Sequence, residues 1–160
     1  MTKNKNHGPL IARHSRELSS KGRLDQTKYF VQHGNTTVYQ HVHSVADIAV
    51  KLNRMFRLQA DEDQLIRAAL LHDYFLYDWH DRDHLHKRPH GFHHPYTALN
   101  NARQDFDLHP TEENAIKRHM FPLIPIPPAH RIGWLVTLAD KISTAKELKQ
   151  YWKSRLLTRN

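Results

Sequence analysis

The chain has 160 residues, which is enough to bury a hydrophobic core and is most simply a single domain. It has no cysteine, which excludes disulfides and cysteine-ligated zinc, and no apolar stretch approaches the roughly 20 residues of a membrane span. The formal net charge of +8 favours anionic partners such as nucleic acid, nucleotides or phosphorylated metabolites. The first residues lack the apolar block of a secretory signal, so we expect a cytoplasmic protein.

Residues 1–25 are polar, basic and weakly periodic, which indicates an N-terminal arm or a short peripheral helix, followed by one helical domain over 26–160. Residues 36–56 have apolar side chains at helical spacing, Val45 and Leu52 among them, and are predicted to form an amphipathic helix. His41 lies four residues before Val45 and therefore shares its buried side.

Residues 60–75 open with acidic side chains suited to a helix N-terminus, and Asp61 is a plausible cap. The apolar run that follows leads directly into His72 and Asp73. Burying such an ionisable pair is costly unless something compensates its charge. Residues 76–92 break all periodicity and are predicted to be a long loop.

Three further helices are expected, over 93–106 with Pro95 in the first turn, over 111–120 and over 132–152. Thr111 is the expected cap of the second of these, and His119 shares a side with its apolar residues. No segment has the pattern of a strand, so the predicted fold class is all-α, a bundle of about six to eight helices.

Several ionisable side chains fall on the buried sides of these helices: His41, His72, Asp73, His119, Asp140, and one or both of His93 and His94. A lone histidine on an apolar face is more often a hydrogen-bonded core residue than a metal ligand. The joint occurrence favours a metal site, because buried charges are normally paired or metal-bound. Imidazole and carboxylate ligands suit divalent Mn, Fe, Ni, Co or Zn.

The segments "HVHSVADIA", "LLHD" and "LADK" resemble the H…HD…D pattern of the HD-domain superfamily, which comprises metal-dependent phosphohydrolases with a helical fold. The resemblance covers about residues 35–145 and implies a metal site at the centre of the bundle. It selects His41 over His43, because a small apolar pair follows His41 at the family's spacing. It also assigns His72, Asp73 and Asp140 as ligands.

A subset of the superfamily has two more histidines and binds two metals. "HHPYTAL" resembles its added helix start and points to His94, with His93 as runner-up, while "IKRHMFPL" points to His119. The resemblance then implies that Asp73 bridges two ions, that His41, His72 and Asp140 complete the first, and that His94 and His119 hold the second. No GYP motif follows His119, so the cyclic-dinucleotide phosphodiesterase branch is not supported.

The activity that this resemblance implies is cleavage of a phosphoester by a metal-bound hydroxide, with His72 and Asp73 as catalytic residues and a small phosphorylated metabolite or nucleotide as substrate. The expected contacts to the substrate phosphate are Lys141, Arg131, Arg118 and His90. The loop over 77–92, which includes His84 and His86, is a candidate cationic lid, and Tyr74, Tyr77 and Trp79 are interpreted as packing residues or stacking partners.

Two other functions fit the same residues. In a single-metal nucleotidase of this fold, His94 and His119 would bind phosphate instead of metal. In a nucleic-acid-binding or regulatory module, the basic ends would bind the partner and the metal would be structural. The apolar residues Tyr151, Trp152, Leu156 and Leu157, if exposed, suggest a homodimer contact.

Overall fold

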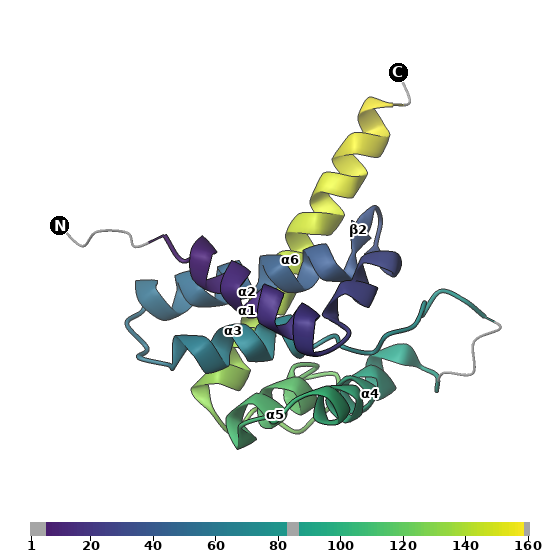
Figure 1. The fold of residues 1–160 in the computed structure, drawn as a ribbon. Helices are drawn as coiled ribbons and strands as arrows, with labels where there is room; N and C mark the ends of the chain where they lie inside the picture. The colour runs from purple at the N-terminus through teal and green to yellow at the C-terminus, as the bar shows by residue number, and fades with distance from the viewer. Residues whose placement is uncertain (1–5, 83–86, 159–160) are drawn as a thin grey trace.

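The computed structural model describes residues 6–82 and 87–158. Its elements in chain order are α1 (Gly8–Lys21), the 3-10 helix η1 (Leu24–Tyr29), β1 (Val31–His33), β2 (Thr36–Thr37), α2 (Val38–Met55), α3 (Glu62–Leu71), α4 (His90–Asp105), α5 (Pro110–Arg118) and α6 (Arg131–Leu157). Regular structure is almost entirely helical (Figure 1), so the predicted all-α fold class is confirmed. Among the described helices, none is long and apolar enough to cross a membrane.

Helix α2 packs against both α3 and α6 and carries much of the core. Its first turn is fixed by a capping box, in which the Thr37 side chain accepts from the Gln40 backbone and the Gln40 side chain accepts from the Thr37 backbone. Val42 and Val45 are fully buried, and His41 lies on the same buried side, as the spacing predicts. The helix thus carries an imidazole into the centre of the domain.

Helix α3 begins as predicted but ends early. The Asp61 side chain accepts from the backbone N–H of Gln64 and caps the helix. The last helical residue is Leu71, and His72 occupies the C-cap, so the predicted continuation to residue 75 is wrong. His72 and Asp73 therefore lie at the buried C-terminal end of a helix, where the chain turns away.

Helix α4 begins at His90, three residues before its predicted start. Pro89 stands at the N-cap with an extended backbone, which leaves His90 as the first helical residue and shortens the predicted loop. Pro95 consequently lies in the second turn and not in the first. Because proline has no N–H, α4 lacks one backbone hydrogen bond there.

Helix α5 is capped by His109 and not by Thr111 as predicted. The His109 side chain accepts from the Thr111 backbone N–H, and Pro110 is the first helical residue. The buried Glu112 carboxylate accepts from the His109 backbone in return. The cap therefore lies two residues earlier than a search for serine, threonine or aspartate suggests.

A two-stranded antiparallel ribbon contradicts the prediction of no strand. β1 and β2 pair through Val31 with Thr37 and His33 with Thr36. Gly34 forms the turn with a φ of +55°, and a Cβ atom at this position would lie 2.8 Å from the Tyr151 ring. The ribbon is thereby held close to α6, and such short strands give no alternating pattern in the sequence.

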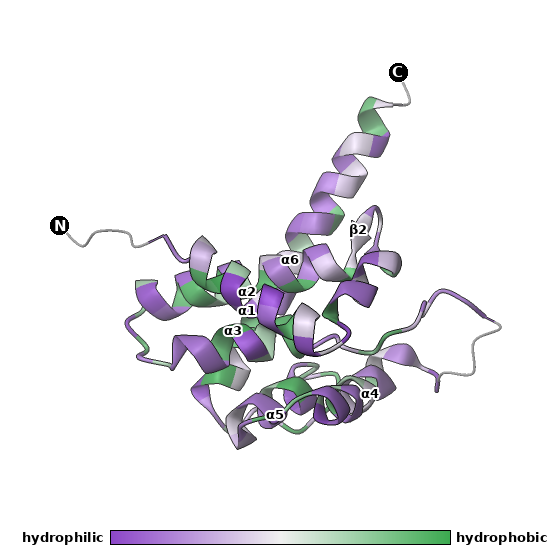
Figure 2. Cartoon of the chain, viewed as in Figure 1, coloured by the Kyte–Doolittle hydropathy of each residue, from purple (hydrophilic) through white to green (hydrophobic). Residues whose placement is uncertain are grey.

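Helix α1 buries Ile11 and Leu18 and packs against α3 and α2. Within the segment predicted as an arm or a peripheral helix, residues 8–21 are helical. Helix α6 is the longest element, and its C-terminal part extends beyond the body of the molecule (Figure 1). In Figure 2 this extension is mainly hydrophilic up to a hydrophobic turn near its end, where Leu156 and Leu157 are exposed.

Candidate metal centre

The six residues predicted as ligands meet in one buried cluster. His41 comes from α2, His72 and Asp73 from the end of α3, His94 from α4, His119 from the end of α5, and Asp140 from α6. The four imidazoles and Asp73 are each at most 5% exposed. Five helices therefore contribute to one small volume at the centre of the domain.

Backbone carbonyl groups orient three of the four imidazoles. His72 and His119 occupy the C-caps of α3 and α5, and each donates from Nδ1 to the carbonyl three residues earlier, Ala69 and Ile116. His94 donates from Nδ1 to the His90 carbonyl at 3.0 Å. The Ala69 and Ile116 carbonyls lie in the last turns of α3 and α5, where carbonyl groups lack helical partners. Because a carbonyl can only accept, all three bonds fix the ring with Nδ1 protonated. In the neutral tautomer, Nε2 then presents a lone pair.

All four Nε2 atoms face the carboxylates of Asp73 and Asp140. Asp73 Oδ1 lies 3.1 Å from His94 Nε2 and 3.5 Å from His119 Nε2. The other oxygen, Oδ2, lies 3.4 Å from His72 Nε2 and 3.7 Å from His41 Nε2. Asp140 Oδ1 lies 3.0 Å from His41 Nε2, on this second side. Asp73 thus stands between two sets of nitrogen donors.

Strong electrostatic coupling keeps both carboxyl groups ionised. Burial raises the pKa of Asp73, but the His72 charge and the contact from His119 outweigh it and hold the pKa well below its ordinary value. Burial is likewise outweighed at Asp140, whose pKa is lowered by the hydrogen bond from His41 and by the charge of His72. Two buried carboxylates need compensating positive charge close by.

The imidazoles respond to the same charges in different ways. Burial lowers the pKa of His41, but hydrogen bonds to Asp140 and Glu147 prevail and raise it to about 9. At His119, burial together with the neighbouring His72 and His94 lowers the pKa. A proton on the His41 ring can therefore compensate the charge of the neighbouring carboxylates. The lowered pKa of His119 instead favours its neutral imidazole form.

The donor set fits divalent metal ions. His94 Nε2 and His119 Nε2 lie 2.9 Å apart, and with both Nδ1 atoms protonated their lone pairs face each other unless a cation lies between them. His72 Nε2 and Asp73 Oδ1 are buried without a hydrogen-bond partner. Donors that share an ion at about 2.1 Å lie roughly 3.0–3.5 Å apart, close to the separations in this cluster.

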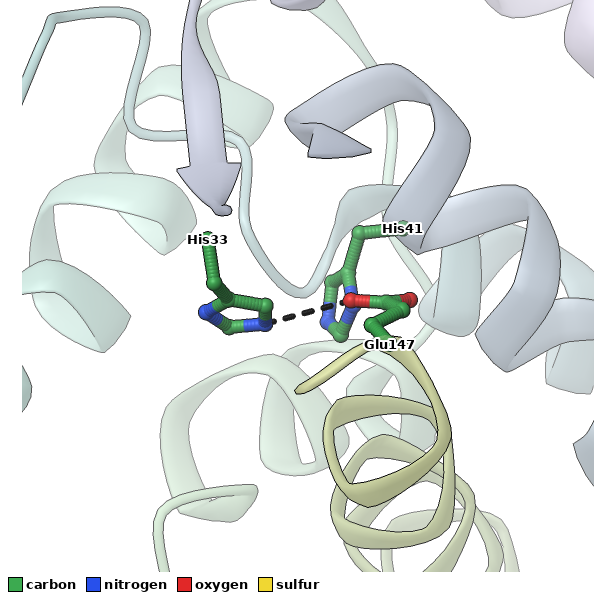
Figure 3. A group of neighbouring side chains, drawn as sticks. All are labelled: His33, His41 and Glu147. Carbon is green, nitrogen blue, oxygen red and sulfur yellow. Dashed lines mark hydrogen bonds and ion pairs between the residues drawn. The ribbon is translucent and has the colours of Figure 1, made fainter. Parts of the chain in front are cut away.

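Glu147 and His33 extend the cluster and were not predicted. His41 Nδ1 lies 3.1 Å from both oxygens of Glu147 and donates to this carboxylate, while His33 Nε2 lies 3.2 Å from Glu147 Oε2 (Figure 3). Burial raises the pKa of Glu147, but the contacts from His33 and His41 outweigh it and lower the pKa to about 2. A carboxylate behind a ligating histidine fixes its tautomer and raises its basicity.

Gln32 is a further neighbour that the sequence did not reveal. Its Nε2 donates to Asp73 Oδ2 at 2.7 Å, from a buried position in β1. The ribbon therefore positions two polar side chains at the centre, Gln32 against Asp73 and His33 against Glu147. Of Glu147, His33 and Gln32, Glu147 alone could have been predicted from the sequence. It follows Asp140 by seven residues, or two helical turns, and therefore lies on the same side of α6.

A pocket of about 710 Å³ opens onto the cluster. Asp73, His94, His119 and Asp140 contribute to its lining, together with the helix start at His90–Gly91. Lys141 also lines it, and its Nζ lies 3.4 Å from the His119 carbonyl oxygen. A pocket of this size accommodates a small organic molecule.

The residues predicted to contact phosphate divide into two groups. Lys141 and His90 line the pocket, and the His90 ring stacks between those of Trp79 and His94. Arg118 is not part of the lining, and Arg131 points elsewhere, because its guanidinium donates to the Leu58 carbonyl.

Two other predictions concern neighbouring histidines. His93, the runner-up for His94, is half-buried and belongs to none of the clustered donor groups found among the described residues. His84 and His86 of the predicted lid lie outside the described residues.

A family model for the HD domain matches residues 38–145, which include all six clustered residues. The chain belongs to the HD-domain family. This family is one of metal-dependent phosphohydrolases, and the buried histidine–aspartate cluster of this HD-domain protein is compatible with its metal site. No curated protein and no solved structure gives a significant match to the chain.

Proposed function

We propose that this HD-domain protein is a phosphoester hydrolase that holds two divalent metal ions. The observation that carries the proposal is the position of Asp73, whose two oxygens face different sets of imidazole nitrogens. His41, His72 and Asp140 would hold one ion, His94 and His119 the other, and Asp73 would bridge them. Ions bound there supply an activated water and neutralise charge on the phosphate oxygens.

The protein's own groups have separate tasks in this reaction. The backbone-anchored rings of His72, His94 and His119 keep their Nε2 atoms directed inward, so the ions need no rearrangement of the ligands. Lys141, at the pocket lining, attracts the phosphate of the substrate. Water adds to phosphorus, the ester P–O bond breaks, and the leaving oxygen takes the proton released from water.

The test begins with metal content per chain, measured by elemental analysis on untagged protein. We expect about two metals in the wild type and about one in His94→Ala. The adjacent His93→Ala is the matched control and should retain both metals, since His93 lies outside the cluster. Asp73→Ala should lose both metals and all hydrolysis of phosphoesters.

One metal in both the wild type and His94→Ala would contradict the two-metal arrangement and favour the single-metal nucleotidase. Absence of metal from folded wild-type protein, with nucleic-acid binding that survives Asp73→Ala, would overturn the hydrolase in favour of the binding module. Salt dependence of that binding distinguishes phosphate-backbone contacts from adventitious association.

A further inference from the structure

The pocket that opens onto the metal centre is lined by both polar and apolar residues. Asp73, Asp140 and Lys141 are among the polar ones, and the apolar ones, here called the wall, are Trp79, Met120, Pro122, Leu123, Ala145 and Leu148. These wall residues come from three separate segments: the loop after α3, the connection between α5 and α6, and α6 itself. The two regions therefore call for a ligand with two chemically different ends.

We propose that the substrate is a phosphomonoester of an apolar or aromatic group and not a nucleoside di- or triphosphate. The inference rests on the proposed phosphohydrolase function, because the metal centre would bind the phosphate. The apolar group would lie against the wall, in contact with Trp79, Leu123 and Leu148.

The first argument is the supply of positive charge. Lys141 is the single lysine or arginine that lines the pocket in the described part of the chain. Two divalent ions with Lys141 exceed the negative charge of Asp73, Asp140 and Glu147 by about two units. One phosphate group carries about −1.5 to −2 charges and neutralises this excess. The further phosphates of a triphosphate would find no arginine or lysine among these lining residues.

The second argument is the exposure of the wall. Leu123 is 46% exposed and Leu148 is 39% exposed, although both line the pocket. Apolar surface of this kind is covered favourably by an apolar ligand, at roughly 25 cal/mol for each Å² removed from water. A hydrophilic group on the phosphate would gain nothing from these leucines.

The third argument is the aromatic side of the pocket. The rings of Trp79 and His90 are parallel to within 12°, with centroids 5.0 Å apart, and His90 stacks in turn on His94. This column of rings connects the wall to a residue of the metal centre. The His80 ring also lies against Trp79, with centroids 3.8 Å apart. Trp79 is half-buried and lines the pocket, so an aromatic ligand can pack edge-on against its accessible surface.

The experiment compares three phosphate compounds on the metal-loaded protein: 1-naphthyl phosphate, glycerol 3-phosphate and ATP. We expect kcat/KM for 1-naphthyl phosphate to exceed that for the other two by about tenfold or more. Leu148→Ser should raise KM for 1-naphthyl phosphate about fivefold and leave the kinetics with glycerol 3-phosphate unchanged. Leu156→Ser, an exposed leucine two turns further along α6, is the matched control and should change neither.

Faster turnover of ATP or glycerol 3-phosphate, or an equal effect of Leu148→Ser on all three compounds, would overturn the inference. Binding of the three compounds, measured by titration calorimetry, distinguishes failure of the substrate inference from failure of the proposed hydrolase function. Preferential binding of 1-naphthyl phosphate that is weakened by Leu148→Ser, without hydrolysis of any compound, would support the pocket assignment and refute the hydrolase. Absence of binding for all three would refute both.

Discussion

Asp73 illustrates why an ionisable pair can follow an apolar helix into the core. Asp73 is 2% exposed, yet Gln32 donates to Oδ2, and the His94 and His72 Nε2 atoms lie 3.1 and 3.4 Å from the carboxylate. Its neighbour His72 stands at a helix end, where a free carbonyl fixes the ring. The burial cost is thus offset by groups that also build the metal centre.

Glu147 acts on the centre through His41, which makes it a positioning residue. Replacing it with alanine removes the acceptor of His41 Nδ1–H, and we expect a 10- to 100-fold loss of metal affinity. Glu147→Gln should lose less, because the amide oxygen still accepts this hydrogen bond. Metal affinity is measured by competition with a chelator.

Lys146→Ala, an exposed neighbour on α6, is the control for Glu147 and should bind metal as the wild type does. Equal metal affinity in Glu147→Ala and the wild type would show that packing alone holds the His41 ring in place. If Glu147→Gln keeps the metal affinity of the wild type, the hydrogen bond to His41 matters and the negative charge of Glu147 does not.

Helical periodicity together with the resemblance to the HD domain indicated the six residues that lie together in the structure, with His93 left open beside His94, but not the residues that support them. His41, His72 and Asp140 follow from helical periodicity combined with ionisable residue types. Gln32 and His33 lie in a three-residue strand, for which no periodicity exists. Contacts between segments more than 100 residues apart, such as His41 with Glu147, depend on how α2 crosses α6 and leave no local pattern.

At the scale of elements, the ends of helices were less predictable than their existence. α4 starts at His90 because Pro89 adopts the extended conformation of an N-cap, and α5 starts after a histidine cap. Helix α3 stops at Leu71 because the chain turns there to direct Asp73 inward. Tertiary packing determines these boundaries, and local propensity only limits the choices.

An ion pair ties the end of α4 to the segment behind Asp73. Arg23 donates to both oxygens of Asp105, at 2.8 and 3.0 Å, and the Tyr74 hydroxyl donates to the same carboxylate at 2.7 Å. Asp105 is the last residue of α4, and Tyr74 directly follows Asp73. The carboxylate therefore joins three parts of the fold close to the centre.

Asp105→Asn should lower the free energy of unfolding by about 1–3 kcal/mol at neutral pH, because the amide has no charge and only one oxygen to accept the hydrogen bonds from Arg23 and Tyr74. Burial raises the pKa of Asp105, but the hydrogen bonds from Arg23 and Tyr74 outweigh it and lower the pKa. A lowered folded pKa means that this stabilisation is complete above the ordinary aspartate value of about 3.9 and is lost as pH falls through the folded pKa.

The difference in stability between wild type and Asp105→Asn should accordingly shrink below about pH 4. Urea unfolding at several pH values measures it. Arg103→Ala, which removes an exposed ion pair with Glu113, is a control that should change stability little. A difference that persists undiminished in acid would mean that packing, and not the charge, is responsible.

At the scale of the whole molecule, the metal centre is also a link between helices. The clustered side chains come from five helices, so an ion held by them would bind the folded chain and not the unfolded one. Ligands of this kind stabilise by mass action, by about 4 kcal/mol at a thousandfold excess over Kd. The stability of the fold and the occupancy of the centre are thus coupled.

We therefore expect chelation of the metal to lower Tm by about 10 °C in a protein of this size. Asp73→Ala, which lacks the carboxylate proposed to bridge the ions, should show the same Tm with and without chelator. Differential scanning calorimetry makes the comparison. A wild-type Tm that does not respond to removal of the metal would show that the centre contributes nothing to the fold.

The crossing of α2 and α6 also sets an order of events during synthesis. His41 and Asp140 are 99 residues apart, while Asp73, His94 and His119 emerge from the ribosome earlier than Asp140. At about 5–20 residues per second, the interval between His119 and Asp140 is of the order of seconds. A nascent chain would thus complete its His94–His119 side first, and the His41 side closes only when α6 docks.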